Sequence, residues 1–279
     1  MRVATRLVRD YWLEVVALAV AGVVFVIPFA FMLVTAAKDR AESSRLEFAL
    51  PTEWQLLENV AEVLDAQNGL MVTALRNSLV LTVGSVAIVV VLSAMVGFVL
   101  QRRRDRVGTA ITALMIAGLI LPPALVPTIY VLQWLQLFKA VPGLILVEIT
   151  QLMPFSVIVF RAFVSAIPRE IDEAAIIDGA GPLNLFFRVI FPLLRPAIIT
   201  VIVVTSVSVY NDFVNPLYFL PGSENATVQL TLFNFQSQFN TRWHLLFTDV
   251  LLITIPPLIM FIFFQRQIVS GMTTGAVKG

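Results

Sequence analysis

Long runs of apolar residues dominate the chain and predict its secondary structure. Six stretches hold at most two charged residues each, and each reaches the length of about 20 residues that an α-helix needs to cross ~30 Å of hydrocarbon. The pattern predicts an all-α, polytopic membrane protein with six transmembrane helices, forming a single domain over residues 1–279. We expect these helices at about 13–36, 77–101, 108–134, 142–163, 196–220 and 245–265.

The basic residues between these helices predict the orientation. With six helices both termini lie on one side of the membrane, and the segments on that side hold 13 of the 19 lysines and arginines. Cytoplasmic segments carry such an excess, so we expect both termini in the cytoplasm. Arg2, Arg6 and Arg9 are typical of a signal peptide. The apolar run after them is too long for one and lacks a small-residue cleavage site, so we interpret it as an uncleaved helix.

The composition excludes most other classes of protein. Of the 279 residues 58% are hydrophobic and 13% are charged, whereas soluble domains are about 25% charged, so a free-standing soluble enzyme is excluded. There is no cysteine and one histidine, His244, which excludes disulfides, a cysteine nucleophile and thiolate or histidine-cluster metal sites. The net charge of +1 gives no basis for nucleic-acid binding. We therefore assign no catalytic and no metal-binding residue.

The predicted outer loop, residues 38–76, is acidic and contains an amphipathic segment. Trp54, Leu57, Val60 and Leu64 recur every three or four residues, which is the spacing of one helix face. Such a helix either lies on the membrane surface or caps the bundle, or it offers a docking surface to an external partner. We favour the first interpretation.

The predicted inner loop, residues 165–195, is far longer than a turn and carries helix signals. Pro168 suits a first helical turn, and the acidic residues that follow it suit the positive end of the helix dipole. Gly179 can end that helix, and Pro182 can begin a second one. We expect a helix, a glycine turn and a second helix on the cytoplasmic face. Anionic lipid would repel the acidic turn, so a protein partner fits better than the headgroup region.

A motif in this inner loop resembles that of a known family. Glu173-Ala174-Ala175, then Gly179, then Phe191-Pro192 resembles the "EAA loop" of ABC-importer permeases, with Val189 and Phe191 in place of the family's Ile and Leu. The tail from residue 265 to 279 is similar to that of carbohydrate importers of the maltose-type "G" subunit group. Three further segments resemble the family: Asn77-Ser78-Leu79, Pro51-Thr52-Glu53-Trp54 with Glu58-Asn59, and Tyr210-Asn211-Asp212-Phe213.

The resemblance implies a type I ABC-importer permease fold whose cytoplasmic loop is a coupling helix. The chain has no phosphate-binding loop, so ATP and Mg would be bound by a separate ATPase and this chain would bind no cofactor. The implied partners are two ATPase subunits, a paralogous permease subunit of six or more spans, and an external solute-binding protein or lipoprotein. The setting is the lipid of a bacterial inner membrane. The implied ATPase-coupling residues are Arg169, Glu173, Ala174, Ala175, Asp178, Gly179 and Ala180.

The C-terminal tail has two open interpretations. The resemblance implies that Gly275 and Lys278 reach toward the ATPase, whereas the small residues around them are equally typical of a frayed end.

Polar residues at membrane depth are candidates for a solute pathway, because charge in hydrocarbon is costly. Tyr210, Asn211, Asp212 and Asn215 could offer donors and acceptors to sugar hydroxyls. A structural contact between Asp212 and another helix is the favoured alternative. We expect Glu148 and Asp249 near the outer ends of their helices, at the interface. Prolines at positions 122, 123 and 127 should break or kink the third helix.

The function expected from these features is import of a sugar, oligosaccharide or polyol. A non-sugar solute such as a glycerol phosphate ester remains an alternative. A secondary transporter that works alone fits less well, because the chain lacks two repeated halves. An intramembrane enzyme is remote, because no nucleophile and base are paired at membrane depth.

Overall fold

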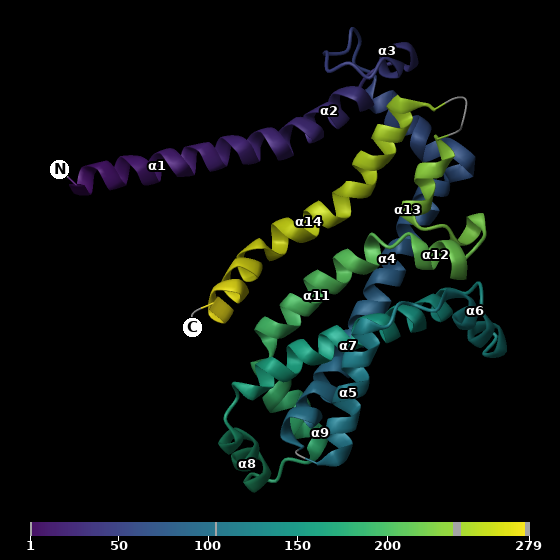
Figure 1. The fold of residues 1–279 in the computed structure, drawn as a ribbon. Helices are drawn as coiled ribbons and strands as arrows, with labels where there is room; N and C mark the ends of the chain where they lie inside the picture. The colour runs from purple at the N-terminus through teal and green to yellow at the C-terminus, as the bar shows by residue number, and fades with distance from the viewer. Residues whose placement is uncertain (1, 104, 237–240, 277–279) are drawn as a thin grey trace. The chain divides into compact units, whose positions relative to one another are not determined.

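The computed structural model describes residues 2–103, 105–236 and 241–276. Every regular element within these ranges is helical. The chain forms two compact units, which we call unit 1 (Met1–Met71 and Thr231–Thr254) and unit 2 (Val72–Leu230 and Ile255–Gly279). Figure 1 labels the helices of both units. The predicted all-α fold is confirmed.

The helices are long and apolar enough for up to six membrane crossings. Four single helices meet this test: Glu14–Ala36, Leu56–Arg102, Val141–Ser165 and Trp243–Gln265. Two bent pairs make up the remainder, Arg106–Ile120 with Leu125–Trp134 and Pro182–Leu193 with Arg195–Tyr210, bent by 119° and 77°. The apolar runs of the sequence therefore fall on these helices, and each bent pair, where it is counted as one crossing, would be a broken one.

Unit 1 contains the N-terminal helix and the outer loop. Its first segment holds α1 (Arg2–Ala21), a π-helical turn (Gly22–Val26), α2 (Ile27–Ala36), α3 (Arg40–Ser44) and the start of α4 (Leu56–Arg102). Its second segment holds the end of α13 (Val228–Thr231), a short 3-10 turn (Leu232–Asn234) and the start of α14 (Trp243–Ala276). Non-helical dihedrals at 66–69 interrupt α4 and separate a short outer-loop helix from the long one. In this outer-loop helix, the amide of Asn59 donates to the carbonyls of Ala36 and Lys38 at 2.8 and 2.9 Å. The outer-loop helix therefore caps the end of α2.

Unit 2 packs α4 against α7 (Val141–Ser165) and α11 (Arg195–Tyr210). Small residues let the first two approach: Ser93 is fully buried, and a Cβ placed on Gly97 would lie 2.9 Å from Cβ of Phe160. The buried core here is formed by side chains of these helices, together with Ile190 and Leu194 from the segment before α11: Val86, Val89, Val90, Ala94, Phe160, Val164, Ala197 and Val201.

The predicted third helix, 108–134, is divided in the structure. It forms α5 (Arg106–Ile120) and α6 (Leu125–Trp134), with Leu121 and Ala124 in non-helical conformations. Pro122 and Pro123 lie in the break, and proline disfavours helix at the residue before it and provides no N–H. The predicted fifth helix, 196–220, is likewise divided between α11 and α12 (Val214–Phe219). A short 3-10 turn, Ser223–Asn225, follows.

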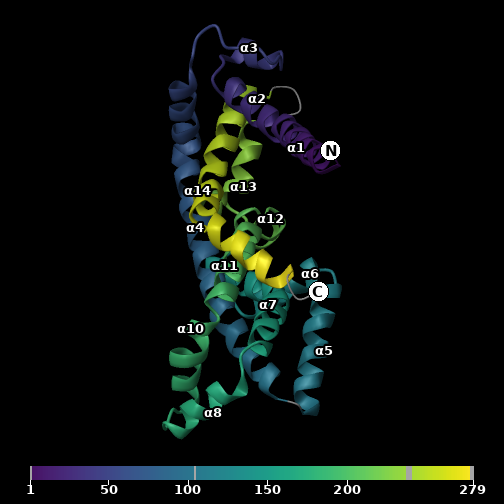
Figure 2. The same ribbon diagram turned by 90° about the vertical axis from the view of Figure 1, so that its left-hand side faces the viewer.

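The remaining helices of unit 2 lie in the predicted inner loop. They are α8 (Arg169–Ile177), α9 (Pro182–Asn184), a π-helical turn (Leu185–Ile190) and α10 (Phe191–Leu193). Figure 2 shows α8 at the end of unit 2 where α4 ends and α5 begins. The loop is therefore a folded extension of the helical core.

Candidate functional site

The inner-loop helix α8 ends in a glycine turn. Its first turn carries Glu170 and Asp172, where the helix dipole favours acids. At its end, the N–H of Gly179 donates to the carbonyl of Ile176 at 3.0 Å, and the N–H of Ala180 donates to the carbonyl of Ala175 at 2.9 Å. This pair of bonds is the Schellman motif, which requires a left-handed residue, and Gly179 has φ +82°. The sequence pattern thus produces a helix with a defined stop.

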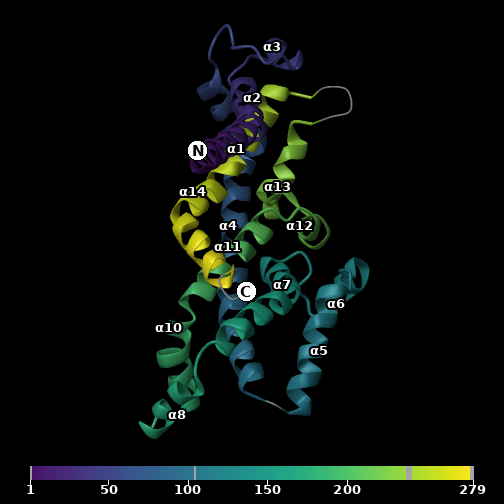
Figure 3. The same ribbon diagram turned by 60° about the vertical axis from the view of Figure 1, so that its left-hand side comes forward.

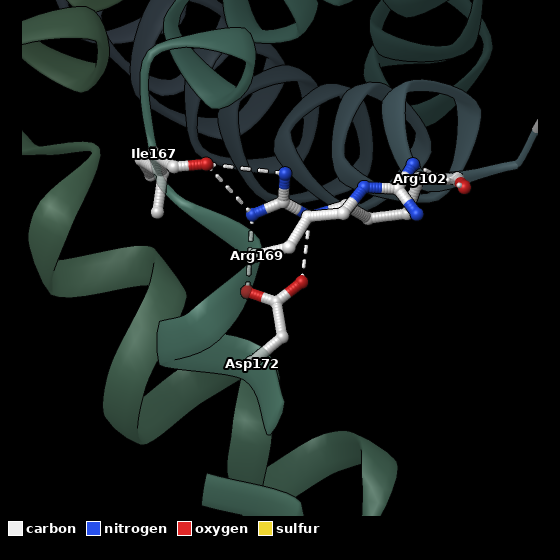
Figure 4. Close-up of polar contacts among 4 residues, drawn as sticks. All are labelled: Arg102, Ile167, Arg169 and Asp172. Atoms are coloured by element: carbon white, nitrogen blue, oxygen red, sulfur yellow. Dashed lines mark hydrogen bonds and ion pairs between the residues drawn. The ribbon is translucent and has the colours of Figure 1, made fainter. Parts of the chain in front are cut away.

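A charge pair fixes α8 to the end of α4 (Figure 4). The Nε and Nη2 atoms of Arg102 lie 2.6 and 3.0 Å from the two carboxylate oxygens of Asp172. The same guanidinium donates to the carbonyl of Ile167 at 3.2 Å, and Nη2 of Arg169 donates to the carbonyl of Arg102 at 3.1 Å. The Arg102 and Asp172 side chains are only 16% and 12% exposed. A two-pronged, largely buried pair of this kind sets both distance and orientation.

The remaining surface of the inner loop is mixed in chemistry. Glu173, Ala174, Asp178 and Gly179 are exposed, while Ala175 and Ala180 are half-buried and pack against the core of unit 2. Arg169 is also exposed, although it is tied to α4 as described above. Beside these residues lie exposed apolar side chains, namely Ile176, Ile177, Leu183 and Phe187. We call these exposed residues of 173–187 the loop face; it combines acidic, small and apolar groups.

The second candidate site is a cavity of about 400 Å³ in unit 2. Polar side chains from two segments meet there: Glu148 and Gln151 from α7, and Asp212, just before α12, with Asn215 in its first turn. Its other lining residues are Pro123, Leu125, Leu152, Ser208 and Val214. A cavity with amides and carboxylates against apolar walls can bind hydroxyl-rich molecules.

Hydrogen bonds order this cavity. The amide of Asn215 donates to Glu148 Oε1 at 3.1 Å and to Gln151 Oε1 at 3.2 Å, and it accepts from Gln151 Nε2 at 3.3 Å. Asp212 Oδ1 accepts from the backbone N–H of Val214 at 2.9 Å and of Asn215 at 3.3 Å. Asp212 therefore caps the start of α12, while its carboxylate also lines the cavity.

The structure brings together two of the four predicted pathway residues. Asp212 and Asn215 share the cavity, whereas Tyr210 is buried and Asn211 is exposed, with its side-chain Oδ1 accepting from Gln229 Nε2 at 3.2 Å. Gln151 lines the cavity although the sequence did not predict it as a pathway residue. Its only signal is an amide in an apolar run, and nothing local shows that it meets Asn215, 64 residues away.

Two carboxylates expected at the membrane interface are buried inside the protein. Glu148 is 3% exposed because it lies two turns into α7, on the side that meets Asn215. Asp249, in unit 1, is fully buried, and its carboxylate oxygens accept from the Thr231 hydroxyl at 3.1 and 3.0 Å. Distance from a helix end was thus a poor guide to the exposure of these carboxylates, because a neighbouring segment covers each of them.

One of the two predicted tail residues lies in the described part of the chain. Gly275 is in the last turn of α14, and Lys278 lies outside the described residues. Within the described ranges, no three His, Cys, Asp or Glu side chains are placed to hold a metal ion.

The fold and these sites define a multi-pass membrane protein with a polar cavity and an anchored helical loop. Residues 89–274 match the family described as binding-protein-dependent transport system inner membrane component, and the chain belongs to this family. It is an inner-membrane ABC-transporter permease of the carbohydrate-importer type, as its motifs predicted.

Curated relatives agree with this assignment, and a solved structure shares the fold. The chain is 27% identical to the melibiose/raffinose/stachyose import permease protein MelC of Bacillus subtilis (strain 168), over 94% of both chains. It is 30% identical to the inner membrane ABC transporter permease protein YcjP of Escherichia coli (strain K12), again over 94% of both. Its fold matches a chain of a bacterial ABC transporter that imports the acidic polysaccharide alginate, with a TM-score of 0.78, 19% identity and coverage of 94% and 96%.

Proposed function

We propose that this chain forms one half of the translocation pathway of an ATP-driven importer for a sugar, an oligosaccharide or a polyol. The single observation that carries the proposal is α8, an anchored helix with a defined glycine stop and an exposed acidic and apolar face. The names of relatives such as MelC support a saccharide as the solute. ATP and Mg would be held by a separate ATPase, and the chain itself would hold no cofactor.

In this proposal α8 transmits motion from the ATPase to the membrane helices. The loop face enters a cleft on the ATPase, where Glu173 meets a basic side chain. ATP binding closes the ATPase pair and moves α8 as a rigid body. Arg102 ties α8 to α4, and Ala175 and Ala180 tie it to the core of unit 2, so the helices follow the movement. A loop without these ties would bend and lose the displacement.

The proposed assembly has five components. Beside this chain stand a paralogous permease subunit, two ATPase subunits and an external solute-binding protein or lipoprotein. One structural neighbour is an alginate ABC transporter in complex with a pentasaccharide-bound periplasmic protein, which supports the last of these partners. Both termini would be cytoplasmic, and the tail with Gly275 and Lys278 would reach toward the ATPase.

The polar cavity of unit 2 is the proposed solute contact of this subunit. Its walls hold two carboxylates, Glu148 and Asp212, two amides and a serine, with no basic side chain. Hydroxyl groups can pair with all of these, whereas a phosphate ester would meet like charge. The lining therefore favours a neutral sugar or polyol over a glycerol phosphate ester.

Co-purification tests the assembly. We expect the tagged chain, extracted gently from native membranes, to bring an ATPase, a sister permease and a binding protein with it. Glu173→Lys should lose the ATPase and keep the sister permease, because it reverses the charge on the loop face. Glu53→Lys, the same reversal on the exposed outer loop, is the matched control and should keep every partner. Purification of the chain alone, with solute transport intact in vesicles, would contradict the proposal.

A substitution in the cavity tests the solute contact. Gln151→Ala removes an amide from the cavity and leaves Asn215 with one hydrogen-bond partner fewer. If the solute also bonds to this amide, the loss should weaken solute binding by about 1–3 kcal/mol. We expect solute uptake to fall about tenfold while the complex still assembles. Thr150→Ala, an exposed neighbour whose hydroxyl bonds its own helix, should leave uptake unchanged. Equal uptake by both variants would remove the cavity from the pathway.

A further inference from the structure

A second polar cavity lies where α4, α5 and α7 come together at the α8 end of unit 2. It has a volume of about 470 Å³. Figure 3 shows the start of α5 at this end of unit 2, so the cavity lies there. Its lining residues are Leu100, Arg103, Gly108, Thr109, Thr112, Ala113, Ile116 and Arg161. None of them lines the cavity of Glu148, so this is a separate site.

Arg161, on α7, is the charge that sets the chemistry of this cavity. Its Nε donates to Gln101 Oε1 at 3.1 Å, and its Nη1 donates to the Thr112 hydroxyl at 2.8 Å. Both acceptors are neutral, and no carboxylate in the described part of the chain pairs with this half-buried guanidinium. A guanidinium offers five N–H groups, so donors remain available. A half-buried cation without a counter-ion favours an anionic ligand.

The neighbouring cations differ from Arg161 in this respect. Arg102 is paired with Asp172, and Arg103 is paired with Asp105. Asp105 also caps α5 by accepting from the N–H of Gly108 at 2.8 Å. That bond and the contact with Arg103 lower the pKa of Asp105, so it is a fixed negative charge close to the cavity. Of the two arginines that line the cavity, Arg161 is therefore the one without a carboxylate partner in the described part of the chain, while Asp105 balances much of the charge of Arg103.

The cavity changes from polar to apolar along α5. Arg103, Gly108 and Thr109 lie around the start of the helix, while Ala113 and Ile116 lie one to two turns further on, about 1.5 Å per residue toward the membrane interior. Farther along the same helix, Leu114, Leu119 and Ile120 are exposed. A phosphate group at the charged end and an acyl chain along the apolar end match this order, whereas free phosphate uses the charged end alone.

We propose that this cavity binds the headgroup phosphate of an anionic phospholipid of the inner leaflet, with Arg161 as the main cation. The hydroxyls of Thr109 and Thr112 donate to the carbonyls of Asp105 and Gly108, at 3.2 and 2.8 Å, and would turn to donate to the phosphate oxygens instead. Leu100, Ala113 and Ile116 would contact the first part of an acyl chain. A basic pocket between membrane helices at the cytoplasmic side is the general setting for such recognition. The bound lipid would hold α5 to the ends of α4 and α7, next to the Arg102 anchor of α8. This proposal does not depend on which solute is carried.

Native mass spectrometry of the assembled importer, delipidated and then titrated with single lipids, tests the site. We expect phosphatidylglycerol to bind several-fold more tightly than phosphatidylcholine. Arg161→Gln should weaken phosphatidylglycerol binding by about fivefold to tenfold, the effect of one basic residue near a membrane surface. Arg195→Gln, which neutralises an exposed arginine outside the cavity, is the matched control and should leave binding unchanged. Equal binding to wild type and Arg161→Gln would overturn the proposal.

Three further arms separate the remaining outcomes. Thr112→Val frees a donor of Arg161 and keeps its charge, so phosphatidylglycerol preference should persist; its loss would contradict the assigned role of the charge. Millimolar inorganic phosphate should not displace the lipid, and complete displacement would point to a free-phosphate site instead. If a carboxylate of the sister permease crosslinks to the cavity and excludes lipid, the cavity is a subunit contact and the lipid proposal fails. Should Arg161→Gln not assemble, Arg161→Lys keeps the charge and should keep the preference.

Discussion

Asp172→Ala should uncouple the importer while leaving the chain in the membrane. The substitution leaves the guanidinium of Arg102, 16% exposed, without its charge partner. Breaking a buried pair by removing one side typically costs about 3–5 kcal/mol, because an uncompensated charge remains. The helices of unit 2 do not depend on this pair for their apolar packing, so we expect the cost to fall on the position of α8. Solute-stimulated ATPase activity should be lost while the sister permease still co-purifies.

Hydrogen exchange and a double-mutant cycle make this prediction specific. The amides of α8 should exchange faster in Asp172→Ala, and those of α7 should not. Arg102→Met with Asp172→Leu should be less damaging than the sum of the two single changes, because no unpaired charge remains. As a control, Arg242→Gln breaks the Arg242–Glu62 pair, whose side chains are 46% and 51% exposed, and should cost ~0–1 kcal/mol. Strict additivity of the two single changes would show that the pair does not anchor α8.

Local sequence signals predict the helix of the inner loop but not the ion pair that anchors it. Pro168, the acidic first turn and Gly179 predict a helix and its stop because these signals act within a few residues. The partner of Asp172 is 70 residues away in the sequence, and no local signal connects it with Arg102. The sequence therefore predicts the helix α8 without predicting what holds it.

For the membrane helices, too, the sequence predicts that they form but not which residues they contact. Length and hydropathy predict that these helices exist, but a helix that is apolar all round does not show which face packs against a neighbour. The break at 121–124 was signalled by Pro122 and Pro123, although its 119° bend was not. Glu148 and Gln151 joined the candidate site only because α7 lies beside Asn215 in the fold.

Gly179→Asp should abolish transport without affecting membrane insertion. Gly179 has φ +82°, where most L-residues are strained, and a Cβ there meets nothing within 4 Å. Aspartate and asparagine tolerate this left-handed conformation better than other residues, so backbone strain alone would leave a partly working loop. The added carboxylate, however, joins Glu173 and Asp178 on the loop face, where a partner must approach closely.

Three companion variants separate these causes of failure. Gly179→Asn keeps the size and conformational tolerance of aspartate without its charge, and it should retain part of the uptake. Gly179→Val introduces a β-branched residue at positive φ, at a cost of about 1–2 kcal/mol or more, and should unwind the end of α8. Gly181→Asp places the same charge at an ordinary φ of −69° with open space around the Cβ.

The pattern of uptake among these variants decides which property Gly179 provides. Failure of both aspartate variants, with Gly179→Asn working, assigns the defect to charge on the loop face. Failure of Gly179→Val alone would assign it to the glycine turn. Uptake by Gly179→Asp equal to that of the wild type, measured with the complex assembled, would show that this face does not dock against the ATPase, and it would leave the anchored helix without its proposed partner.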